Sequence, residues 1–101
     1  MKKIKHIYLA LTDKEEQTIN ICSKTILNMK KSALLEISVE KAMESNMVFG
    51  EDDKYGKRRE IHKHFRIDPA IDEKIDKYCN DNHMIKSEFI RSSIAWYIKS
   101  N

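Results

Sequence analysis

Glycine and proline are scarce in this chain of 101 residues, which contains two glycines and one proline. A Gly-rich loop that holds a dinucleotide or a nucleoside triphosphate needs several backbone positions without a Cβ atom. Gly50 and Gly56 cannot supply such a loop, and neither is followed by Lys-Ser or Lys-Thr. The same scarcity disfavours an all-β fold with many turns and favours long helices.

Long apolar runs and paired cysteines are also lacking. The longest apolar stretch near the start, from Ile7 to Leu11, is too short for a membrane span or for the core of a secretory signal. Cys22 and Cys79 lie far apart, and no CxxC pair exists. We therefore expect reduced thiols, no membrane segment and a cytoplasmic location.

Charge and hydrophobic content permit a small folded domain. Lys and Arg total 19 and Asp and Glu total 16, which gives a net charge of +3. This mild basic bias allows nucleic acid as a partner without implying it. Hydrophobic residues make up 41% of the chain, and its length suits one compact domain or two very small units that share a core.

The first part of the chain predicts one strand and two helices. Alternation with a period of two predicts a strand over residues 5–12. Thr12 and Glu15, spaced as in a capping box, predict the start of a helix that runs to about residue 27. Asn28, which tolerates the left-handed conformation, predicts a break, and helical spacing resumes over residues 30–46.

A linker and a second copy of this pattern follow. Residues 47–59 hold both glycines and a run of charges, and we interpret them as the linker. A second strand is predicted over residues 60–68. Asp68 as N-cap and Pro69 at the first helical position predict the next helix. The last helix is predicted over residues 86–99.

The two units, residues 1–46 and residues 60–101, are similar in sequence. At an offset of 55, residues 28–46 match residues 83–101 at 6 of 19 positions. A unit of about 45 residues with a single strand can neither pair its strand nor close a core alone, so a repeat supplies each unit with a partner. At an offset of 56, the aligned apolar residues are Leu9, Leu11 and Ile19 with Phe65, Ile67 and Ile75.

A strand, a helix, a turn and a helix in about 45 residues, twice over, resemble the ribbon-helix-helix superfamily of DNA-binding regulators, the Arc and MetJ type. In the second copy the strand ends in Arg66 and an aliphatic residue, Pro69 stands near the first helix start, and KSEFIR opens the second helix. The first copy keeps LALTDKEE and NMKKSALLE but has Ala10 at the position of Arg66. The resemblance covers about nine tenths of the chain.

This resemblance implies a mainly helical fold with a short two-stranded antiparallel ribbon. Two ribbon-helix-helix units in one chain would form a pseudo-dimer, either within one chain or by exchange of halves between two chains. In the family, the ribbon enters the major groove of double-stranded DNA and its outer face reads base edges. The residues that alternate with the apolar ones, and so are predicted to read bases, are His6, Tyr8, Ala10, His62, His64 and Arg66.

The family also holds a DNA phosphate at the start of the second helix of each unit. Free backbone N–H groups, the helix dipole, a hydroxyl and a lysine together favour an anion there. The alternative for these helix starts is ordinary capping with solvated lysines. The alternative for the outer face of the ribbon is a solvated strand face without a partner. The predicted phosphate-binding residues are Lys30, Lys31, Ser32, Lys86 and Ser87.

Neither a metal site nor catalysis is predicted. His62 and His64 share the outer strand face, whereas Cys79 and His83 lie four residues apart on a helix with Cys79 toward the core, so these side chains should not converge. No nucleophile has a recognisable base beside it, and the carboxylates suit caps and solvated helix faces. We therefore expect no enzyme and no cofactor.

The resemblance implies a transcriptional regulator, which in this family is most commonly a repressor. The small size and the Lys, Ile and Asn usage suit a virus, phage or plasmid. The alternatives are an accessory DNA-binding protein of plasmid transfer and, in another class, a protein-binding helical module. Phe49 and Trp96 lie off the repeated apolar stripe, so they either cover a contact between units or chains, as in self-association, or fill gaps within the chain.

Overall fold

Two strands that lie far apart in the sequence pair with each other. In the computed structural model, which describes residues 4–26, 28–49 and 61–100, β1 (Lys5–Leu11) and β2 (Ile61–Ile67) form a two-stranded antiparallel sheet. Tyr8 lies opposite His64 at the centre of this ribbon. The predicted antiparallel ribbon is therefore confirmed, while most of the predicted linker, from residue 50 onward, lies outside the described residues.

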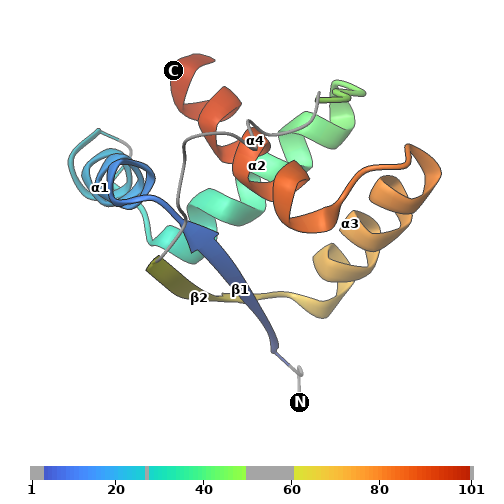
Figure 1. The fold of residues 1–101 in the computed structure, drawn as a ribbon, viewed down its shortest axis with the longest axis horizontal. Coiled ribbons are helices and arrows are strands. Elements are labelled where there is room, and N and C mark those ends of the chain that lie inside the picture. The colour runs from blue at the N-terminus through green and yellow to red at the C-terminus, as the bar shows by residue number, and fades with distance from the viewer. Residues whose placement is uncertain (1–3, 27, 50–60, 101) are drawn as a thin grey trace.

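Four α-helices make the rest of the fold mainly helical. α1 (Asp13–Ile21) continues into a short π-helical segment, η1 (Cys22–Ile26), and α2 (Lys31–Glu44) follows it. α3 (Pro69–Asp81) and α4 (Lys86–Ser100) follow β2. The ribbon lies at one edge of the molecule, α2 and α4 cross its middle, and α1 and α3 lie on opposite sides (Figure 1). No helix in the described ranges is long and apolar enough to cross a membrane.

The helix starts follow from local sequence, as predicted. Thr12 Oγ1 accepts a hydrogen bond from the Glu15 N–H at 3.1 Å, and Glu15 Oε1 accepts one from the Thr12 N–H at 2.8 Å. This reciprocal pair is the expected capping box. Asp68 Oδ1 accepts a hydrogen bond from the Ala70 N–H at 2.9 Å, and Pro69 occupies the first position of α3.

The breaks between helices fall at residues with left-handed backbone. Asn28, between η1 and α2, has a φ of 48°, and His83, between α3 and α4, has a φ of 55°. Asparagine tolerates this conformation because its short polar side chain forms local hydrogen bonds. The predicted break at Asn28 is confirmed.

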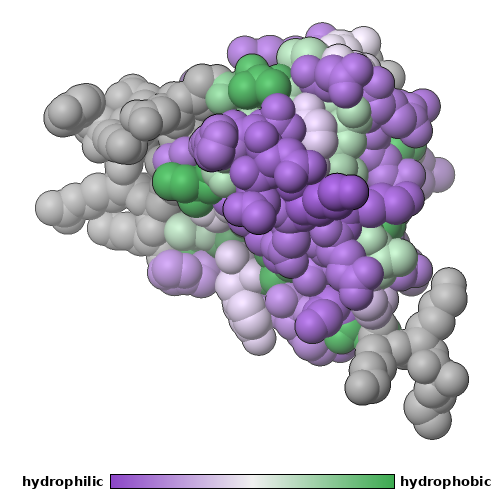
Figure 2. Space-filling view, turned by 90° about the vertical axis from the view of Figure 1, so that its right-hand side faces the viewer, coloured by the Kyte–Doolittle hydropathy of each residue, from purple (hydrophilic) through white to green (hydrophobic). Residues whose placement is uncertain are grey.

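A single hydrophobic core draws on both units. The inner face of the ribbon is buried beneath the crossing of α2 and α4, and the repeated apolar positions of the two units pack together there. Ser38 and Ser93, equivalent in the repeat, are also fully buried on these two helices. Figure 2, which views the molecule from the α3 side, shows a mainly hydrophilic surface with scattered apolar residues. The buried core residues include Leu9, Leu11, Ile19, Leu34, Leu35, Val39, Phe65, Ile67, Ile75, Phe89, Ile90 and Ile94.

The two aromatic residues that lie off the repeated apolar stripe, and one charged residue of β2, have partners in the fold. Phe49 and Trp96 pack against the core, and the Phe49 ring lies 6.0 Å from the Phe89 ring. This packing agrees with the interpretation that each fills a gap within the chain. Lys63, the charged residue among the inward-facing positions of β2, reaches Glu16 of α1 at 3.4 Å.

Candidate nucleic-acid interface

The six residues predicted to read bases lie on the outer face of the ribbon. Their inward-facing neighbours Leu9 and Phe65 are at most 1% exposed, whereas five of the six outer residues are exposed and only Ala10 is half-buried. Because successive side chains of a strand point to opposite faces, burial of one set fixes the exposure of the other. The cross-strand pairs on this face are His6 with Arg66, Tyr8 with His64, and Ala10 with His62.

Three rings gather at the centre of this face. The His6 and His64 rings stack with centroids 4.6 Å apart, and His6 Nδ1 forms a hydrogen bond with His64 Nε2. The Tyr8 ring lies 5.0 Å from His64, and its side chain is 68% exposed. Each imidazole has a second nitrogen outside this bond, so both rings retain a hydrogen-bonding group.

The end of β2 that carries Arg66 is joined to the start of α2. The Arg66 N–H donates to Ser32 Oγ at 3.2 Å, and the Asp68 N–H donates to Glu36 Oε2 at 3.0 Å. These two bonds hold the first turns of α2 beside the exposed Arg66 side chain. Ser32 therefore accepts a bond from the ribbon, while its O–H can still donate.

The start of α2 faces an open hollow of about 590 Å³ with three lysines at its border. Lys30 is the N-cap residue of α2, and its side chain makes no cap bond to the first helical N–H groups. Within the described part of the chain, Lys30 and Lys31 have no ion-pair partner. The hollow is lined by Ser23, Lys24, Asn28, Met29, Lys30, Lys31 and Ser32.

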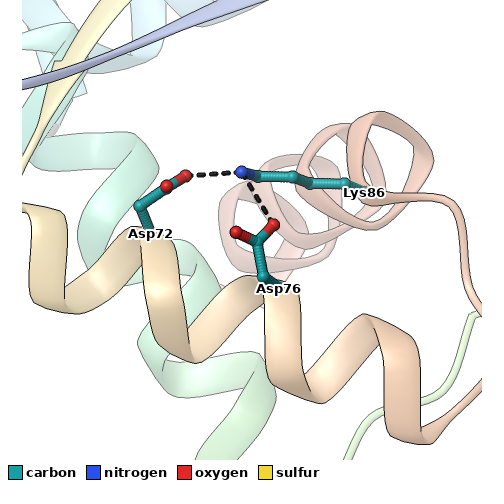
Figure 3. Close-up of polar contacts among 3 residues, drawn as sticks. All are labelled: Asp72, Asp76 and Lys86. Atoms are coloured by element: carbon teal, nitrogen blue, oxygen red, sulfur yellow. Dashed lines mark hydrogen bonds and ion pairs between the residues drawn. The ribbon is translucent and has the colours of Figure 1, made fainter.

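The start of α4 is arranged differently. Lys86 Nζ lies 2.5 Å from Asp72 Oδ1 and 2.9 Å from Asp76 Oδ1, two carboxylates one turn apart on α3 (Figure 3). Partial burial alone would lower the pKa of the Lys86 ammonium, but the hydrogen bonds and charges of the two carboxylates raise it overall. Lys86, which was predicted to bind a phosphate, therefore directs its charge at α3 in this structure. Ser87 follows it as the second residue of α4 and is partly exposed.

Sequence reasoning missed the acidic partners of Lys86 and the third lysine of the hollow. Asp72 and Asp76 are spaced four apart on one helix, which places them on the same face and is a signal for a shared cation. Lys24 lies in η1, at the end of the first helical segment, where the helix dipole favours basic residues. Its position beside the start of α2 depends on the turn at Asn28.

The residues considered for a metal do not converge. Cys79 is buried at 3% exposure in α3, while His62 and His64 point outward from the ribbon. Among the described residues, no group of three or more His, Cys, Asp or Glu side chains is arranged to hold a metal ion. Burial, and next the negative charge of Asp76, raise the pKa of the Cys79 thiol to about 11, although Lys86 opposes the shift.

We expect Cys79 to resist thiol reagents at pH 8 in the native protein, because its thiol is buried and protonated. A Cys22→Ser variant isolates this thiol, and its reaction with a chromogenic disulfide should accelerate at least tenfold in denaturant. Since folding raises the pKa, Cys79 stabilises the fold below about pH 9, and this contribution is lost as the pH rises toward 11. Equal rates with and without denaturant would contradict the expectation.

Comparisons with known proteins give no match, neither to a family model nor to a curated protein or a solved structure. The functional argument therefore depends on the residues and their geometry.

Proposed function

We propose that this chain is a sequence-specific double-stranded DNA-binding protein that inserts the outer face of its β-ribbon into the major groove. The main observation behind this proposal is that one face of the ribbon exposes His6, Tyr8, His62, His64 and Arg66 together. A two-stranded ribbon fits a groove that is about 12 Å wide. These side chains are His, Tyr and Arg, which offer hydrogen-bonding groups to base edges, rather than the Ser, Glu and Lys of an ordinary solvated strand face.

We further propose that the two units act as the halves of a ribbon-helix-helix pseudo-dimer. The strand register supports this interpretation. Tyr8 faces His64, and the two are equivalent at the repeat offset of 56. The same offset exchanges the flanking pairs, because His6 with Arg66 becomes His62 with Ala10. A local two-fold axis through the ribbon produces such a register, and two-fold proteins suit two adjacent DNA half-sites.

The phosphate contacts in this proposal come from the start of α2. Lys30 and Lys31 border an open hollow beside the first helical N–H groups, to which the N-cap side chain makes no bond. Cations and free N–H groups at a helix start favour a phosphate oxygen. Ser32, which links this helix start to Arg66, sets the distance between the backbone contact and the base contact.

The role that fits best is a cytoplasmic transcriptional regulator that represses by occupying a promoter. An accessory protein of plasmid transfer would bind DNA by the same surface and differ in its target. A protein-binding module is the alternative class, and no observation favours it. Among the described residues, the large exposed apolar side chains come from separate parts of the sequence and are Ile4, Tyr8, Ile21, Val48 and Ile85.

Binding to DNA should depend steeply on salt. Each phosphate that a lysine neutralises releases counterions, so that the two or three lysines at the start of α2 predict a slope of about −2 to −3 for log affinity against log salt. Fluorescence anisotropy of a labelled duplex from the DNA upstream of the coding region measures this slope, with a scrambled duplex as control. Failure to bind any duplex at low salt would refute the proposed function.

A further inference from the structure

The two ends of the ribbon carry different side chains, although the repeat makes them equivalent in position. At one end the exposed Arg66 guanidinium lies opposite His6. The hydrogen bond from the Arg66 N–H to Ser32 joins this end to the start of α2, where Lys30 and Lys31 border the open hollow. Base-reading and phosphate-binding groups thus occur side by side at this end.

Among the described residues, the other end of the ribbon has His62 but no outward-facing arginine, and its helix start has no lysine outside an ion pair. Ala10, at the position equivalent to Arg66, is half-buried and presents only a methyl group, opposite His62. Its carbonyl oxygen accepts a hydrogen bond from Arg91 Nη1 at 3.3 Å, which ties α4 to this end. At the start of α4, Lys86 is occupied by two carboxylates of α3 (Figure 3). The charge of Lys86 is thus neutralised within the protein.

We infer that one chain makes its strong DNA contacts at the Arg66 end of the ribbon only and selects a non-palindromic site. This inference rests on the proposed function and specifies its target. Arg66 can donate two hydrogen bonds to guanine O6 and N7, and the lysines of the α2 start neutralise phosphates on the same flank. Ala10 can make only an apolar contact, such as with a thymine methyl group. The half-site at the Arg66 end therefore carries the sequence preference.

The first test uses the wild-type chain and four duplexes derived from its strongest site. Scrambling the half-site at the Arg66 end should lower affinity about 10- to 100-fold, whereas scrambling the other half should lower it less than threefold. A duplex with two copies of the strong half should bind at most about twofold tighter, because it offers only a second orientation. Ethylation interference should place the critical phosphates on one flank.

The second test compares substitutions at the two equivalent positions. Arg66→Ala should lower affinity for the preferred site about 5- to 100-fold and relax one base position. Ala10→Arg is the matched variant, and it should raise affinity about fivefold or more for the duplex with two strong halves but not for the original site. Circular dichroism checks that both variants fold. If Ala10→Arg does not fold, the wild-type duplex series decides.

The possible failures are separable. Equal losses of affinity on scrambling either half-site, or critical phosphates on both flanks, would overturn the inference that only the Arg66 end makes strong contacts. DNA binding itself would remain. A chain that binds no duplex at low salt would instead remove the proposed function on which the inference rests.

Discussion

Phe89→Ala should lower the free energy of unfolding by about 3–5 kcal/mol. Phe89 is 1% exposed on α4, and its ring lies 5.2 Å from Tyr78 and 6.0 Å from Phe49. It joins α3, α4 and the segment after α2 in one cluster. Removing the ring leaves a cavity that these separate elements cannot close without moving apart, so the cost includes lost burial and lost packing.

Urea denaturation followed by circular dichroism measures this loss. The matched control is Lys99→Ala, an exposed position on the same helix, which should change stability by less than about 0.5 kcal/mol. Small domains are stable by only about 5–15 kcal/mol, so the Phe89 variant should also lose DNA binding on mild warming. A loss below about 1 kcal/mol would mean that the aromatic cluster does not support the core.

The elements of this fold could be predicted because their signals are local. Alternation at Ile7, Leu9 and Leu11 reports burial of one strand face, and the capping pair of Thr12 and Glu15 marks a helix start. The repeat strengthens each signal, since the same positions are apolar twice. Whether the strands pair within one chain depends on the path between the units, and the structure pairs β1 with β2 of the same chain.

The candidate site was predictable only in part. The outward-facing ribbon residues follow from the alternation alone, so that Arg66 and its neighbours could be named from the sequence. The role of Lys86 could not, because its ion pairs depend on how α3 lies against α4. Lys31 and Lys86 are equivalent in the repeat, yet only α3, and not α1, supplies carboxylates to the helix start that follows it within the described residues.

This difference separates the effects of two equivalent substitutions. Lys86→Met removes a charge but keeps the apolar stem, and it leaves Asp72, whose side chain is only 12% exposed, without its cation. The free energy of unfolding should fall by about 1–3 kcal/mol. Lys31→Met removes a charge that has no ion-pair partner in the described part of the chain, so its effect on stability should stay within about 0.5 kcal/mol.

The order of the two effects should reverse for DNA binding, where Lys31→Met should have the larger effect and Lys86→Met the smaller. Lys31→Met should weaken binding to all duplexes alike and make the salt slope less negative by about 0.9, because one phosphate contact is lost. Lys86→Met should leave the slope unchanged at temperatures where it remains folded, since its ammonium is occupied by Asp72 and Asp76. Urea denaturation and salt-dependent anisotropy on the same preparations measure both quantities. A flatter slope for Lys86→Met would mean that DNA draws this lysine away from α3, and the two helix starts would then serve the backbone equally.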